Sequence, residues 1–180
     1  MFGLPLNANQ ASCRVIVDIP REKAWELLRD LSLAHNYVPG VLQVQITTSR
    51  KEGEGASRRV YQSKTNYINE TVEEWIEGQG FLIRLHLEEA GPPFPFKEAW
   101  FRYEIKSEGE RTELTTSLIY TSRWGATGRL LDRLILNRII SNRIRDIAFC
   151  LKVFWETGEP VTKKQLKQAR AALKRARSHS

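Results

Sequence analysis

The sequence predicts a single α+β domain, in which a curved, seven-stranded antiparallel sheet packs on one long C-terminal helix. Six strand-like segments joined by short turns occupy residues 42–122, and a long apolar-striped segment from about Gly125 to Trp155 follows directly. One further strand and two short helices precede the six strands. A sheet followed by one long helix implies a cavity between the two.

The first strand is expected over SCRVIVDI, residues 12–19, where Cys13, Val15, Val17 and Ile19 alternate with more polar positions. A helix is expected to begin at Pro20 and to continue through REKAWELLRDL, because a proline in the first turn loses no helical hydrogen bond. The segment LAHNYVPG then predicts a second short helical turn.

The six central strands are expected to form an antiparallel meander, since the segments between them are short and rich in glycine or proline. In the turn KEGEG, the glycines are expected to supply positive φ angles in a hairpin. That loop lacks the GK[ST] ending of a phosphate-binding loop. The expected strands lie near residues 42–50, 56–64, 67–77, 80–89, 96–107 and 111–122.

Alternation along these strands predicts which side chains face the helix. Tyr103 and Tyr120 are the members of this set whose hydroxyls could orient a ligand in a mostly apolar pocket, although core packing alone also explains them. The expected inward set is Phe81, Ile83, Leu85, Leu87, Ala99, Phe101, Tyr103, Ile105, Leu114, Thr116, Leu118 and Tyr120.

Glu70 is the weak candidate for a catalytic residue. It lies between Ile68, Val72 and Ile76 in the alternation, which places a carboxylate on the inner face. Such a group is costly unless it is paired or protonated, and burial would raise its pKa. Two structural alternatives remain open: the register turns Glu70 to solvent, or an arginine such as Arg59 neutralises it.

The long helix carries one apolar stripe over its second half, with polar residues on the opposite arc. The stripe changes sides near Leu136, which predicts a kink or a separate short helix there. Arg129 and Arg133 then lie close to the later stripe and either approach the end of the sheet or extend to solvent at its rim. The expected stripe is Leu136, Ile140, Ile144, Ile147, Ala148, Leu151, Phe154 and Trp155.

Composition excludes several classes of protein. Of the 180 residues, 41% are hydrophobic, and no apolar run approaches the roughly 20 residues of a membrane span. The start MFGLPLNANQ lacks the features of a secretory signal, so a cytoplasmic protein is expected. The three histidines and two cysteines show no metal-ligand spacing, so neither a metal nor another cofactor is expected.

Positive charge is concentrated at the C-terminus. The net charge is +7, and residues 160–180 hold seven Lys or Arg and no Asp or Glu, so the preceding residues are neutral. We therefore divide the chain into a ligand-binding domain, 1–158, and a basic tail, 159–180. The tail has helix-forming composition and is expected to be a solvated, partly frayed helix, or else a docking element for RNA, a ribosome or an anionic membrane through residues 163–177.

The order of elements resembles the START-related, birch-pollen-allergen-like helix-grip superfamily (SRPBCC), especially its polyketide cyclase/dehydrase and lipid-transport branch. The segments that carry the resemblance are VDIPREKAWELLRDLSLAHNYVPGV, GEGASRRVY, INETVEEW and WGATGRLLDRLILNRI, within residues 12–156. The resemblance implies a helix-grip fold with an internal hydrophobic cavity that binds lipids, sterols, quinones or polyketides. It implies no shared catalytic set.

The expected function is therefore the binding of a hydrophobic small molecule, as a carrier or sensor. The alternatives are a cyclase/dehydratase-type enzyme that uses Glu70 or a tyrosine, and an interaction protein that docks through its tail; a homodimer is a further possibility. The rim of the cavity is expected at residues 90–96, at Ser122 to Trp124, and at His35 and Tyr37. The expected ligand-binding residues are Glu70, Phe101, Tyr103, Leu118, Tyr120, Trp124, Arg133, Ile140, Ile144 and Ile147.

Overall fold

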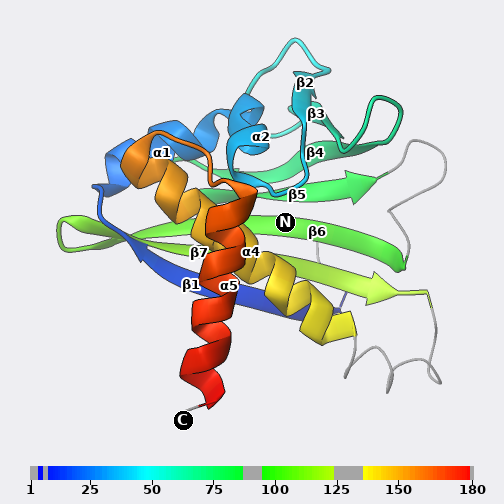
Figure 1. Cartoon of the computed structure of the whole chain (residues 1–180). Helices are drawn as coiled ribbons and strands as arrows, with labels where there is room; N and C mark the ends of the chain where they lie inside the picture. Colours follow the sequence, from blue (N-terminus) through cyan, green and yellow to red (C-terminus); the bar gives the residue numbers. More distant parts are fainter. Residues whose placement is uncertain (1–3, 6–7, 87–94, 124–135, 179–180) are drawn as a thin grey trace.

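The computed structural model describes residues 4–5, 8–86, 95–123 and 136–178. Seven antiparallel strands form one sheet in the order β1-β7-β6-β5-β4-β3-β2, and a long helix, α4, runs diagonally across it (Figure 1). The predicted fold class is confirmed. The strands are β1 (Asn9–Val17), β2 (Gln43–Ile46), β3 (Ser57–Tyr61), β4 (Tyr67–Ile76), β5 (Gly80–His86), β6 (Phe96–Glu108) and β7 (Arg111–Ser122).

The short helices lie between β1 and β2 and close one end of the sheet (Figure 1). Helix α1 (Arg21–Arg29) begins after Pro20, as the sequence predicts. A 3₁₀ turn, η1 (Leu31–Leu33), follows, and Asp30 caps it by accepting a hydrogen bond from the Ser32 backbone N–H. Helix α2 (Ala34–Tyr37) is a single turn.

Helix α4 (Asn137–Thr157) packs on β1 and β7 through the predicted apolar stripe. The stripe residues from Ile140 to Trp155 are buried, whereas Leu136 is partly buried at the start of the helix. Gly158 ends α4 in the left-handed conformation, with φ of 78°, where glycine has no steric penalty. The expected face change concerns residues 129–135, which lie outside the described residues.

The inner face of the sheet is built as the alternation predicts. Cross-strand register aligns side chains into rows beneath α4, one of which runs through Phe81, Tyr103 and Thr116, and a second through Ile83, Phe101 and Leu118. Leu87 lies outside the described residues. The remaining inward residues are buried except Leu85, which packs on the core while partly exposed.

Two details of the strands differ from the sequence predictions. Strand β1 begins three residues earlier than expected, at Asn9, because residues 9–11 pair with the end of β7. In β4, a register shift between Val72 and Glu74 reverses the alternation. The prediction that Ile76 faces inward is therefore wrong: its residue is 54% exposed, and Trp75 packs on the core instead.

The opposite face of the sheet carries a smaller apolar cluster. Leu82, Trp100 and Ile119 are buried there, and Leu4 and Ala8 pack against them. The chain segment before β1 thus covers part of the outer face.

The basic C-terminal segment forms a second helix, α5 (Lys163–Ser178), which crosses α4 and extends beyond the domain (Figure 1). Arg170 on α5 donates hydrogen bonds to both carboxylate oxygens of Asp146 on α4, at 3.0 and 2.5 Å. Val161 and Leu166 pack on the main core. The expected helix is present, and these contacts hold its first turns against the domain, so this part of the tail is not fully solvated.

Candidate functional site

A buried ion pair lies on the inner face of the sheet. Arg58 and Glu70 are direct cross-strand partners on β3 and β4, and Arg58 Nε donates to Glu70 Oε2 at 2.6 Å. Their side chains are only 3% and 13% exposed. Arg58 Nη1 also donates to the backbone oxygen of Leu31, the first residue of the 3₁₀ turn. The pair ties two strands to the short helices.

Glu70 therefore faces inward, as predicted, and an arginine neutralises it. Neutralisation by an arginine is one of the two structural alternatives that the sequence left open. The partner is Arg58, not Arg59. The Arg59 side chain instead donates to Asn69 Oδ1 and lies over the Tyr67 ring. Burial is the largest single influence on the pKa of Arg58 and lowers it, but the Glu70 carboxylate together with Tyr37 and Tyr103 outweighs burial, so the pKa of Arg58 is raised.

Two tyrosines adjoin this pair. The rings of Tyr37 on α2 and Tyr103 on β6 meet edge to face, with their centroids 6.4 Å apart. Burial raises the pKa of both phenols, and the nearby Arg58 charge only partly offsets it. Both hydroxyls are therefore neutral in the physiological range and can donate a hydrogen bond.

Three buried polar atoms have no hydrogen-bond partner among the described residues: Tyr37 Oη, Thr116 Oγ1 and Trp155 Nε1. Thr116 is the cross-strand neighbour of Tyr103, and Phe154, next to Trp155, packs on Tyr37 with ring centroids 6.3 Å apart. Tyr37 and Thr116 thus both adjoin Tyr103, in one region between α4 and the sheet, whereas Trp155 is a buried residue of the last turn of α4. An unpaired buried polar group costs about 1–3 kcal/mol, so such groups are usually paired with water or a ligand.

Apolar side chains surround these polar groups. The predicted site residues that the structure describes all contribute to the packing between α4 and the sheet, apart from Glu70, which supplies the charge. Sequence reasoning missed Arg58, because its pairing depends on the register of a hairpin. The apolar members are Phe101, Leu118, Ile140, Ile144 and Ile147, together with Tyr103 and Tyr120.

The structure describes only some of the residues that were expected at the rim of the cavity, and it buries one of them in the core. Tyr37 is wrong as a rim residue, because it is 1% exposed and lies in the core, whereas His35 is partly exposed. Arg123 is exposed beside Phe96, whose backbone oxygen accepts from its Nε. Trp124 and Arg133 lie outside the described residues, as do residues 90–94.

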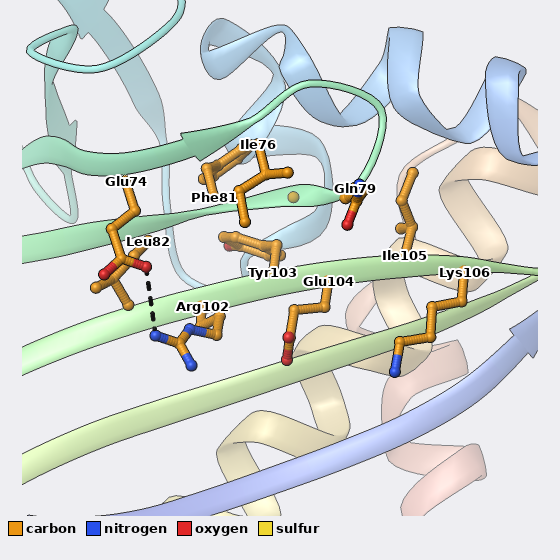
Figure 2. Close-up of a pocket in the computed structure, with 11 residues that line it drawn as sticks. Glu74, Ile76, Gln79, Phe81, Leu82, Arg102, Tyr103, Glu104, Ile105 and Lys106 are labelled. Atoms are coloured by element: carbon orange, nitrogen blue, oxygen red, sulfur yellow. Dashed lines mark ion pairs between the residues drawn. The ribbon is translucent and has the colours of Figure 1, made fainter. Parts of the chain in front are cut away.

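A hollow of about 190 Å³ lies against strands β5 and β6 (Figure 2). Outward-pointing side chains of β6 line it, among them Arg102, which pairs with Glu74 at 3.6 Å, and Lys106. Figure 2 shows these charged side chains on the side of the sheet away from the helices. Tyr103 and Ile105, which are buried in the core, border this hollow as well.

Within the described residues, no three His, Cys, Asp or Glu side chains group closely enough to hold a metal ion. Cys13 and Cys150 are both free thiols. Of the helices that the structure describes, none combines the length and the apolar character that crossing a membrane requires.

Comparison with known proteins connects this geometry to a family. The family model "Polyketide cyclase / dehydrase and lipid transport" matches residues 10–147, which span β1 to the middle of α4. A search of the curated proteins finds no match.

Solved structures match across most of the chain. The protein TTHA0849 from Thermus thermophilus is 17% identical, with a TM-score of 0.61, over 82% of this chain and 97% of that one. The Zhui aromatase/cyclase from Streptomyces sp. R1128 is 14% identical, with a TM-score of 0.57, over 86% and 100%. Ara h 8.0201 is 11% identical, with a TM-score of 0.58, over 81% and 98%. At these identities the likeness concerns the fold alone.

Proposed function

Because the chain belongs to the polyketide cyclase/dehydrase and lipid transport family, we propose that it binds a hydrophobic small molecule between α4 and the inner face of the sheet, as a carrier or sensor. One observation supports this proposal above others: two buried polar atoms without partners among the described residues, Tyr37 Oη and Thr116 Oγ1, lie on either side of Tyr103 among apolar side chains between α4 and the sheet. A mostly apolar site with a few convergent polar groups is the usual form of a small-molecule pocket.

The proposed ligand contacts follow from the position of each side chain. Ile140, Ile144 and Ile147 would cover the ligand from α4, while Phe101 and Leu118 would support it from the sheet. The tyrosine hydroxyls and Thr116 would supply its hydrogen bonds. Trp124 and Arg133 remain proposed contacts from the segment that precedes α4, with the Arg133 guanidinium extended to solvent at the rim, where water screens its charge.

Native mass spectrometry of protein purified from its own source, followed by solvent extraction, tests the proposal. We expect one retained hydrophobic molecule per chain. Leu118→Trp, which adds bulk beneath α4, should lose the molecule, whereas Leu82→Met, a near-isosteric change on the outer face, should retain it. Circular dichroism verifies that both variants fold. Retention by Leu118→Trp with loss in Leu82→Met would contradict the proposed location.

The second candidate is a cyclase or dehydratase that acts in the same region. The observation that favours it is the neutral Tyr37 phenol beside the Arg58 charge, an arrangement that can protonate or polarise a carbonyl group. The Glu70 carboxylate accepts a hydrogen bond from Arg58, so Tyr37 is the preferred candidate for this role. Incubation with a linear poly-β-keto thioester should yield a product that has lost one water molecule. Tyr37→Phe should abolish that reaction while binding persists.

We also propose that α5 anchors the domain to an anionic membrane, which suits a carrier of hydrophobic molecules. Its lysines and arginines are accompanied by no acidic residue in residues 160–180, and clustered cations bind anionic lipid surfaces. Vesicles containing phosphatidylglycerol should bind the intact chain in a salt-dependent manner. Deletion of residues 163–180 should remove this binding. Stronger binding to RNA than to vesicles would favour an interaction protein instead.

A further inference from the structure

The polar end of the interior carries no net charge. Among the described residues near it, the fully buried cation is Arg58, and Glu70 neutralises it at 2.6 Å. The other buried charged side chain among the described residues, Asp146, is paired with Arg170 on α5. Among the described residues, the polar groups that remain for a ligand are therefore uncharged hydroxyls and an indole N–H.

Cations at the edge between α4 and β1 are already engaged. Lys152 donates to the Ile16 backbone oxygen and to Glu156, and Arg145 donates to Asn142 Oδ1. Both side chains are partly exposed, so water screens their charge. They do not supply a buried counter-ion beside Tyr37.

The unpartnered atoms define which hydrogen bonds a ligand could complete. Tyr37 Oη and Thr116 Oγ1 can each donate and accept, whereas Trp155 Nε1 only donates. A ligand carbonyl or hydroxyl oxygen accepts such hydrogen bonds without bringing a charge. A carboxylate or phosphate could also accept them, but none of the described residues offers a free buried counter-ion for its charge, and burying an uncompensated charge is strongly unfavourable.

We propose that the interior selects an uncharged ligand, a long-chain or polycyclic ketone or alcohol, and discriminates against carboxylates and phosphates of the same apolar size. This inference rests on the proposed binding function. It narrows the ligand class to neutral molecules that carry a carbonyl or hydroxyl group. Fatty acids and phospholipids are excluded as preferred ligands.

Displacement of bound N-phenyl-naphthylamine, a neutral fluorescent probe, provides the test. Dodecanol, methyl decyl ketone and dodecanoate are compared at about pH 8, where the carboxylic acid is ionised. We expect the alcohol and the ketone to bind at least about tenfold more tightly than dodecanoate, since only the latter buries an unpaired charge. Equal or tighter binding of dodecanoate would overturn the inference while leaving the proposed function intact.

The same measurements also test the proposed function, the binding of a hydrophobic molecule. If neither the probe nor the alcohol binds, by fluorescence and by calorimetry, the interior does not bind hydrophobic ligands, and the preference is wrong as well. The two failures are therefore distinguishable.

Two variants test the origin of the preference. Glu70→Gln leaves Arg58 uncompensated, so the preference for dodecanol over dodecanoate should fall by about tenfold or reverse. Asp146→Asn is the matched control, because it makes the same change in the other arginine-paired carboxylate and should leave the preference unchanged. If Glu70→Gln fails to fold by circular dichroism, the double variant Arg58→Met, Glu70→Leu must retain the neutral preference. An unchanged preference in folded Glu70→Gln, or a lost one in the double variant, would contradict the charge argument.

The hydroxyls are tested separately. Tyr37→Phe and Thr116→Val should each weaken dodecanol binding about three- to tenfold while the affinity for the probe stays constant. Equal losses for the probe and the alcohol would mean that these residues only support packing, and would overturn their proposed role in hydrogen bonding.

Discussion

Two arginine–carboxylate pairs have similar geometry but very different surroundings. The two carboxylates are similarly buried, Glu70 at 13% and Asp146 at 9% exposed, but the Arg58 side chain is 3% exposed between two strands whereas Arg170 is 56% exposed. Removing one member of the first pair leaves a charge that water cannot reach. In the second pair, water can solvate the arginine. The inner pair is therefore required for the stability of the core, whereas the outer pair only holds α5 on α4.

The largest expected effect comes from breaking the inner pair. Glu70→Leu should lower the free energy of unfolding by about 3–5 kcal/mol, because it leaves Arg58 buried without a counter-charge. Urea denaturation measures the change. In the double variant Arg58→Met, Glu70→Leu most of the loss should be recovered. A double variant as unstable as Glu70→Leu would mean that the two charges are not energetically coupled.

Breaking the outer pair should have a smaller effect that is confined to α5. Asp146→Asn should cost about 1 kcal/mol, because the exposed Arg170 regains water. Hydrogen exchange of the α5 amides should accelerate while exchange in β6 and β7 is unchanged. Glu159→Gln, which removes an exposed carboxylate near the same helix, serves as the control. Faster exchange throughout the sheet would contradict the claim that this pair stabilises only the attachment of α5.

Salt distinguishes the two pairs without a mutation. Raising the ionic strength to about 1 M shortens the screening length to about 3 Å, which weakens exposed charge pairs far more than buried ones. The α5 amides should therefore exchange faster at high salt, and the residues around Arg58 should not. Equal acceleration in both regions would remove the distinction between them.

The smallest effect concerns a third carboxylate, Glu77, whose two oxygens accept hydrogen bonds from the indoles of Trp75 and Trp25, each at 2.9 Å. The Trp75 bond, then the Trp25 bond, holds the pKa of Glu77 below its ordinary value of 4.5. Its contribution to stability is thus present above pH 4.5 and is lost as the pH falls through the lower folded-state pKa.

Tryptophan fluorescence during acid titration should report this transition as a small change. Glu77→Gln should remove it, and Glu159→Gln should leave it in place. A titration curve that is identical in Glu77→Gln and the unmodified chain would show that the indoles respond to another group.

The fold could be predicted because its signals are local and repeated. Alternation identified the inward residues of β6 and β7, and helical spacing identified the α4 stripe, since both follow from backbone geometry. The exceptions have physical causes. Ile76 was misplaced because the irregularity after Val72 shifts the alternation, and no residue in that stretch is a glycine or proline that would mark it.

The candidate site was predicted less completely because it depends on long-range register. Glu70 was identified, and an arginine partner was one alternative, with Arg59 as the example. Only the pairing of β3 with β4 places Arg58 opposite Glu70. Tyr37 was expected at the rim because its helix is a single turn, too short for periodicity to show which side is buried. A chain pattern can predict a buried charge, but not which distant residue compensates it.

A crystal structure of the protein with its extracted or added neutral ligand tests the central claim most directly. We predict ligand density between α4 and strands β6 and β7, with an oxygen within hydrogen-bond distance of Tyr37 Oη or Thr116 Oγ1. Ligand density confined to the outer hollow beside Arg102 and Lys106, with the interior filled by side chains, would contradict the account.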